Sequence, residues 1–370
     1  MIYCPNNCGK HYTSAAWLAR HVASCVPATA LSGGGPAHAS PALPRLPPPS
    51  SWSWALDTTL CDPTATGLCQ PRLYRKIPYA IRVEVQRAFV LPLRRLRDDP
   101  GDIAAWKVFL MFPVWCLPLP HHGGQAGHRE TRRRITRFLG GDWESLHHEH
   151  IARCTPPPQE RGSSGGGGAG EGADGGRREA GRSGGVGGTV GEGGGGGGNL
   201  NRALLLGRSG ELSRSARALV TQPLARGTEE TVAQLRDLHP ISPAALPDFV
   251  GDFRPPDDFI LERDSFAVAL RGAPSHSAAG LSGMVFEHFR DVLDPDDPAS
   301  GFDLLFHVAA HVARGRIPAS ICHLLGASRL VALDKGGGAV RPLAVGEGFY
   351  RLISRAICLQ IREALHDHFE

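Results

Sequence analysis

The segment ASRLVALDKGGGAVRPLAVGEGFYRLISR, residues 327–355, decides the fold of the C-terminal part of this chain. Residues 327–333 and 340–345 are short aliphatic runs, and three consecutive glycines, residues 336–338, lie between them. Two such runs around a glycine turn predict a β-hairpin. Beyond the hairpin, apolar residues recur at helical spacing and predict a long closing helix. These residues are Phe349, Leu352, Ile353, Ala356, Ile357 and Ile361.

Helical periodicity dominates residues 76–154. Ile81, Val85, Ala88 and Phe89 fall on one helical face, and Trp106, Phe109 and Leu110 repeat the pattern further on. An arginine cluster at residues 129–137 precedes Phe138, Leu139 and Trp143, which predicts an amphipathic helix with a basic face.

Helical signals return after residue 200. Thr228 has the chemistry of an N-cap, with Glu229 and Glu230 in the first turn that follows. Ser282 is predicted to cap a helix bearing Val285, Phe289, Val292 and Leu293, and another helix is expected over residues 302–315, with Pro318 opening the next. The predicted fold class is therefore α+β and mostly helical.

Two stretches lack the composition of a folded core. Residues 27–75 are rich in proline, serine and alanine and predict an extended linker, whereas residues 155–199 are mostly glycine and are predicted to be disordered. These stretches separate the predicted regions: a small Cys/His unit, the linker, two helical regions around the glycine tract, and the C-terminal region that contains the hairpin. The boundaries are 1–26, 27–75, 76–154, 155–199, 200–260 and 261–370.

The chain has 370 residues, a formal net charge of +4 and nine cysteines. This mildly basic balance permits nucleic-acid binding without requiring it. The cysteines form no disulfide framework, and the polar N-terminus does not resemble a signal peptide. We expect a protein that is not secreted, located in the nucleus or in a cytoplasmic ribonucleoprotein, without a membrane anchor or an evident obligate protein partner.

The first 26 residues carry the spacing Cys-x3-Cys-x12-His-x3-Cys. Its members, Cys4, Cys8, His21 and Cys25, supply four N or S ligands, which suits a tetrahedral structural Zn²⁺. His11 is a competing candidate ligand, although its place inside the finger loop favours a surface role. Tyr12 and Leu18 stand where a ββα finger has its small core.

This unit resembles the classical zinc-finger family over its full length, with Cys25 in place of the more common second histidine. The resemblance places Ser14, Ala16, Trp17 and Arg20 at the base-facing positions of the helix. Of these, Arg20 is the strong candidate for a base or phosphate contact.

Residues 270–370, with LSGMVFEHFRDVL and ALDKGGGAVRPLAVGEGFYRLISR as the most specific parts, resemble the reverse transcriptases of non-LTR retrotransposons. The resemblance implies a partial fingers subdomain in which Lys335 and Arg341 contact the phosphates of an incoming nucleotide. Arg351 and Arg355, four residues apart, are candidates for lining a template groove. From spacing alone, ordinary solvated charges beside a surface hairpin are the preferred interpretation of Lys335 and Arg341, and the resemblance reverses this preference. Arg351 and Arg355 are also compatible with the solvated face of the last helix.

The same resemblance implies Mg²⁺ held by carboxylates in palm motifs, which we expect only downstream of Glu370. Asp296-Asp297 and Asp98-Asp99 are predicted to be turn residues, so no catalytic residue is assigned and the chain alone is expected to be inactive as a polymerase. The predicted function is DNA or RNA binding by a fragment of a retrotransposon RNA-directed DNA polymerase. A zinc-finger DNA-binding regulator with a scaffold C-terminal region is the alternative, and a relic without selected activity is a third.

Overall fold

The computed structural model describes residues 2–3, 11–12, 44–57, 71–120, 122–154, 197–208, 210–239 and 259–369. The chain divides into two compact units, Met1–Pro44 and Arg45–Glu370. In the first unit, β1 (Ile2–Tyr3) pairs antiparallel with β2 (His11–Tyr12), so that Ile2 lies opposite Tyr12. Such a strand pair is what the ββ half of a ββα finger requires, and Cys4, Cys8, His21, Cys25 and Arg20 lie outside the described residues.

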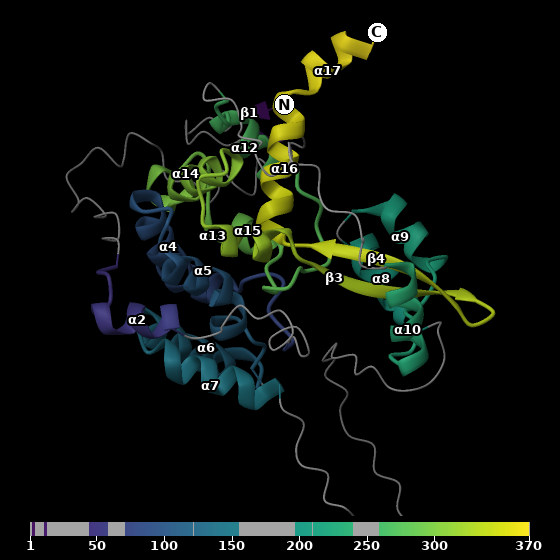
Figure 1. Cartoon of the computed structure of the whole chain (residues 1–370), viewed down its shortest axis with the longest axis horizontal. Coiled ribbons are helices and arrows are strands. Elements are labelled where there is room, and N and C mark those ends of the chain that lie inside the picture. Colours follow the sequence, from purple (N-terminus) through teal and green to yellow (C-terminus); the bar gives the residue numbers. More distant parts are fainter. Residues whose placement is uncertain are drawn as a thin grey trace, which may run out of the picture. The chain divides into compact units, whose positions relative to one another are not determined.

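In its described residues, the second unit is mostly helical with one β-hairpin (Figure 1). Its helices before the glycine tract are α2 (Pro49–Asp57), η2 (Tyr79–Ile81), α4 (Arg82–Asp98), α5 (Ile103–Cys116), α6 (Gly124–Leu139) and α7 (Trp143–Cys154). After it come α8 (Gly197–Arg208), α9 (Leu212–Leu219), α10 (Glu229–Leu238), α12 (Arg263–Arg271), α13 (Phe286–Val292), η3 (Pro298–Ser300), α14 (Phe302–Ala313) and α15 (Ala319–Gly326). The hairpin of β3 (Ser328–Gly336) and β4 (Ala339–Gly346) precedes α16 (Gly348–Gln360) and α17 (Arg362–Phe369).

Helix α5 is the centre of the hydrophobic core. Apart from Lys107 it is apolar, as expected of a helix surrounded by others, and Asp102 caps it by accepting a hydrogen bond from the Ala105 N–H at 3.0 Å. The Phe109 ring lies 5.6 Å from Phe89 of α4 and 5.3 Å from Phe349 of α16. One core therefore joins helices from residues 76–154 and 261–370, which the sequence analysis treated as separate regions.

The predicted linker over residues 27–75 contains a helix. Within α2, Trp52 is only 3% exposed, and its ring lies 4.5 Å from that of Trp143. The Arg95 guanidinium covers the same indole at 4.6 Å from its centre. Burying a tryptophan between a second ring and a cation compensates for the low helical content expected of a proline-rich sequence.

Several predicted elements are confirmed. The hairpin and α16 lie where the sequence places them, α14 begins at Phe302, and the Thr228 side chain accepts a hydrogen bond from the Thr231 N–H at the start of α10. The predicted basic helix is α6, although Trp143 belongs to α7.

The prediction that Ser282 caps a helix is wrong. Helix α13 begins only at Phe286, because Gly283 adopts a left-handed backbone conformation with φ of 78° and interrupts the chain before it. The Ser282 hydroxyl instead donates to the carboxylate of Glu347, at 2.7 Å. The same hydroxyl accepts a hydrogen bond from the Met284 N–H at 3.1 Å, so it caps the turn before α13 and not the helix itself.

Helices α8 and α9 pack on each other around a small core of Ala203, Leu206 and Ala218. The Ser215 hydroxyl of α9 donates to the carbonyl of Ala203 in α8 at 2.7 Å. Helix α8 begins inside the stretch predicted to be disordered, residues 155–199, of which residues 155–196 lie outside the described part. Among the helices described, none combines the length and apolar character that crossing a bilayer requires.

Candidate nucleic-acid interface

The hairpin presents Lys335 and Arg341 to solvent. Leu333 lies opposite Arg341 and Asp334 opposite Val340, whereas the next pair is Gly336 with Ala339, so Lys335 is the extra residue of a β-bulge. Both cationic side chains are exposed. Neither side chain makes an ion pair or a hydrogen bond with any residue that the structure describes.

Three glycines shape the tip of the hairpin. Gly336, Gly337 and Gly338 all have positive φ values, of 85°, 64° and 81°, which a side chain would strain. The Asp334 carboxylate accepts a hydrogen bond from the Gly336 N–H at 2.8 Å, and Gln234 of α10 donates to the Gly338 carbonyl at 3.0 Å. The tip is therefore held by contacts that leave Lys335 and Arg341 available for a ligand.

A third chain segment lies along the outer edge of β3. Leu224 forms an isolated antiparallel bridge with Leu333, and the Ala225 N–H donates to the Ala332 carbonyl at 3.0 Å. The Asp334 N–H in turn donates to the Pro223 carbonyl at 2.9 Å. Sequence reasoning missed this segment, because three residues that begin with proline carry no strand periodicity.

The structure places Arg351 and Arg355 against a loop. Arg351 donates to the Ala278 carbonyl at 2.6 Å, with its guanidinium 5.1 Å from the centre of the Phe286 ring. Desolvation lowers the pKa of Arg351, against the opposing charge of Glu347. Arg355 donates to the Gly272 carbonyl at 3.1 Å. Both side chains, predicted to line a template groove, thus brace the chain between α12 and α13.

The basic face predicted for α6 is partly neutralised within the protein. Arg132 pairs with Glu84 at 2.8 Å, and Arg134 is buried and pairs with Glu130. Arg137 pairs with both Asp142, at 2.8 Å, and Glu149. Two arginines of this helix, Arg129 and Arg133, are left exposed.

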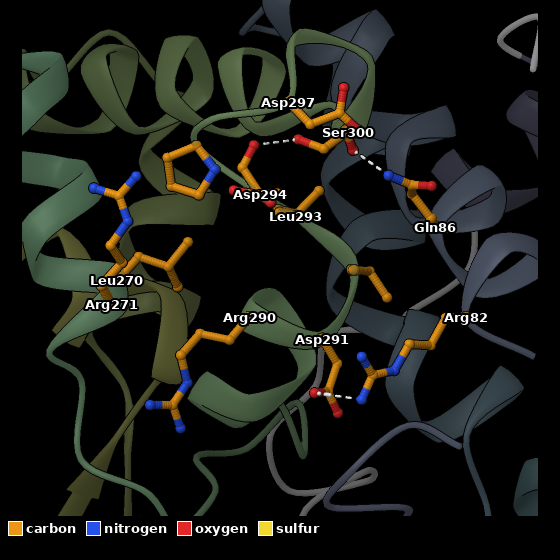
Figure 2. Close-up of a pocket in the computed structure, with 12 residues that line it drawn as sticks. Arg82, Gln86, Leu270, Arg271, Arg290, Asp291, Leu293, Asp294, Asp297 and Ser300 are labelled. Atoms are coloured by element: carbon orange, nitrogen blue, oxygen red, sulfur yellow. Dashed lines mark hydrogen bonds and ion pairs between the residues drawn. The ribbon is translucent and has the colours of Figure 1, made fainter. Parts of the chain in front are cut away.

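A cavity of about 460 Å³ lies between α4, α12 and α13 (Figure 2). Its charged side chains have protein partners: Arg82 pairs with Asp291 at 3.1 Å, and the Asp297 carboxylate accepts the Ala299 N–H at 2.9 Å. Gln86 donates to the Ser300 carbonyl at 3.0 Å on the same wall. Arg82, Gln86 and Asp297 are thus engaged within the protein, and these contacts join the helices around the cavity.

Asp296 and Asp297 lie in a turn, as predicted, whereas Asp98, also predicted to be a turn residue, is the last residue of α4. Asp297 caps the short helix η3, and its neighbour Asp296 pairs with Arg271 at 2.6 Å. Asp99 follows α4 and accepts the Gly101 N–H at 3.0 Å. In the described part of the chain, no group of three or more His, Cys, Asp or Glu side chains is arranged to hold a metal ion.

No family model, curated protein or solved structure matches this chain. The resemblances to zinc fingers and to reverse transcriptases, the zinc ligands and the localisation therefore remain predictions.

Proposed function

We propose that this chain binds single-stranded RNA or DNA, as the nucleic-acid-binding part of a retrotransposon-type RNA-directed DNA polymerase. The observation that carries the proposal is the pair of exposed cations on the hairpin, Lys335 and Arg341, without acidic partners among the described residues. The sequence resemblance to reverse-transcriptase fingers supports the same reading.

Phosphate is the ligand chemistry that suits these two side chains. Arginine offers a planar fork that can bind two phosphate oxygens, and lysine offers a compact point charge. The acid next to Lys335 in the sequence, Asp334, accepts a hydrogen bond from the N–H of Gly336 at 2.8 Å. Neutralising phosphates releases condensed counterions, so affinity should fall as salt concentration rises.

Binding, rather than polymerisation, is the activity proposed for this chain. Two-metal phosphoryl transfer requires carboxylates that hold Mg²⁺ between the attacking and leaving oxygens. Asp296 and Asp297 are engaged in an ion pair and a turn cap, and Asp98 pairs with Arg97 at 2.7 Å. We therefore expect the purified chain to extend no primer on a primed template.

Fluorescence anisotropy with a labelled single-stranded oligonucleotide tests the proposal. The double variant Lys335→Ala/Arg341→Ala should weaken binding and reduce the slope of log affinity against log salt by about 1.4, since each phosphate contact on a single strand contributes about 0.7. The matched control is Arg97→Ala/Arg362→Ala, which removes the same charge from exposed positions elsewhere. Equal affinities for the two double variants would contradict the role of the hairpin.

A further inference from the structure

Five arginines from different parts of the chain converge on one surface loop, residues 272–278, here named the GAPSHSA loop. Arg355 binds the carbonyl of Gly272, Arg290 that of Ala273, Arg214 that of Ser275, Arg75 that of Ser277 and Arg351 that of Ala278. They come from four places: the segment before η2, α9, α13 and α16.

The acceptors in this arrangement are neutral. Arg290 donates to the Ala273 carbonyl at 2.8 Å and to the Ser275 hydroxyl at 3.0 Å, and Arg214 donates to the Ser275 carbonyl at 2.5 Å. Guanidinium groups form stronger hydrogen bonds with phosphate oxygens than with neutral carbonyls. The GAPSHSA loop therefore satisfies these donors without neutralising their charge.

Positive charge is concentrated around the loop. Desolvation lowers the pKa of Arg75, and the charges of Arg202 and Arg214 lower it further, against the opposing charge of Glu287. A second carboxylate, Glu211, lies 3.7 Å from Arg214. With Glu347 beside Arg351, three acidic side chains face a larger number of guanidinium groups, which leaves an excess of positive charge for an anionic ligand.

The GAPSHSA loop and its contact with Glu287 contain a strained backbone conformation and buried polar atoms without hydrogen-bond partners. His276 has a φ of 59°, the only positive φ among the described residues other than glycine. Its N–H donates to one oxygen of Glu287 at 2.5 Å, whereas the other oxygen of Glu287 and Nδ1 of His276 are buried without a partner. Backbone strain and unmatched buried polar atoms together indicate a segment that another ligand can replace.

We propose that Arg75, Arg214 and Arg290 form a binding site for the phosphates of a single nucleic-acid strand, and that the GAPSHSA loop occupies this site until the strand displaces it. The inference rests on the proposed nucleic-acid binding and extends it to residues remote from the hairpin. Gly272, Pro274 and Ala278 are exposed, so a strand can approach the loop from solvent.

The test uses the full chain and a labelled oligothymidylate of about twenty nucleotides. The variant Arg75→Ala/Arg214→Ala should bind at least tenfold more weakly, with a salt slope smaller by about 1.4. The control Arg97→Ala/Arg362→Ala should bind like the wild type. Circular dichroism and the melting midpoint establish that each variant is folded.

Hydrogen exchange of the wild-type chain supplies a measurement independent of any variant. Saturating oligonucleotide should accelerate exchange in the peptide that contains residues 272–278, because displacement frees the His276 N–H from Glu287. Unchanged or slowed exchange would overturn displacement by the strand. Pyrophosphate alone is the second ligand to test. If it accelerates exchange in this peptide as much as the oligonucleotide does, and the oligonucleotide does not compete with it, the site binds small anions and the strand is not its ligand.

The outcomes separate this inference from the proposed function. If Lys335→Ala/Arg341→Ala weakens binding while Arg75→Ala/Arg214→Ala does not, the hairpin binds the strand and the arginine site is wrong. If the wild-type chain binds no oligonucleotide, both proposals are wrong. If only the Arg75 and Arg214 variant loses affinity, the arginine site stands and the role of the hairpin does not.

Discussion

Replacing Glu347 by alanine should destabilise the second unit by about 3 kcal/mol. The side chain is 2% exposed, and its carboxylate accepts three hydrogen bonds: from the Ser282 hydroxyl at 2.7 Å, the Ser282 N–H at 3.1 Å and the Gly348 N–H at 2.9 Å. Each hydrogen bond to a charged group contributes about 1.5–3 kcal/mol, and the contributions are not additive. Because Ser282 is partly exposed, water can replace some of the loss, which gives the estimate of about 3 kcal/mol.

Urea unfolding followed by circular dichroism measures this change. Glu347→Gln should fall between the wild type and Glu347→Ala, because its amide keeps one acceptor oxygen and replaces the other with a donor. Glu363→Ala is the matched control, since Glu363 also lies at the start of a helix but is exposed. If Glu347→Ala and Glu363→Ala differ by less than about 0.5 kcal/mol, the carboxylate does not hold the 282–284 segment against α16.

The remaining predictions concern packing, protonation and zinc. Trp52→Ala should cost about 3–5 kcal/mol in urea unfolding, because it removes a buried ring from the core. Gly280→Ala should cost about 1–3 kcal/mol, since a Cβ there would lie 2.6 Å from Cα of Glu347. Burial, aided by neighbouring positive charge, lowers the pKa of His150 from 6.5 to about 4. As the pH falls, the unfolded chain therefore takes up a proton before the folded chain does, and the free energy of unfolding should decrease between about pH 6.5 and 4. His150→Gln should reduce this dependence of the free energy of unfolding on pH. Cobalt bound to the chain should show a tetrahedral thiolate spectrum that Cys25→Ala alters.

The hairpin and the closing helix could be predicted because their signals are local. Alternating aliphatic residues, a glycine turn and apolar residues at helical spacing all lie within residues 327–361. The Thr228 cap was predictable for the same reason, since the capping serine or threonine and its N–H partner are three residues apart.

The GAPSHSA loop and its arginines were not predictable from the sequence. Arg75 and Arg355 are separated by most of the chain, and each donates to a backbone carbonyl, an acceptor that every residue carries. No sequence pattern therefore indicates to which backbone carbonyl a given arginine donates. Helix α2 escaped prediction for a related reason, because Trp52 is ordered by Trp143 and Arg95 rather than by its own neighbours.

The two proposed phosphate-binding surfaces meet at one carboxylate. Strand β4 ends at Gly346, and Glu347 then caps α16 while binding Ser282, only four residues beyond the GAPSHSA loop. A nucleic-acid strand that displaces the loop is therefore expected to disturb the contact between Ser282 and Glu347, the residue that directly follows the hairpin. If the hydrogen bond between Ser282 and Glu347 links the two surfaces, Ser282→Ala should accelerate hydrogen exchange in the GAPSHSA loop even without oligonucleotide. The position of the exposed Arg341 on the hairpin should not change. Loop exchange that is unchanged in Ser282→Ala would show that the arginines alone hold the loop, and the two surfaces would then bind their phosphates independently.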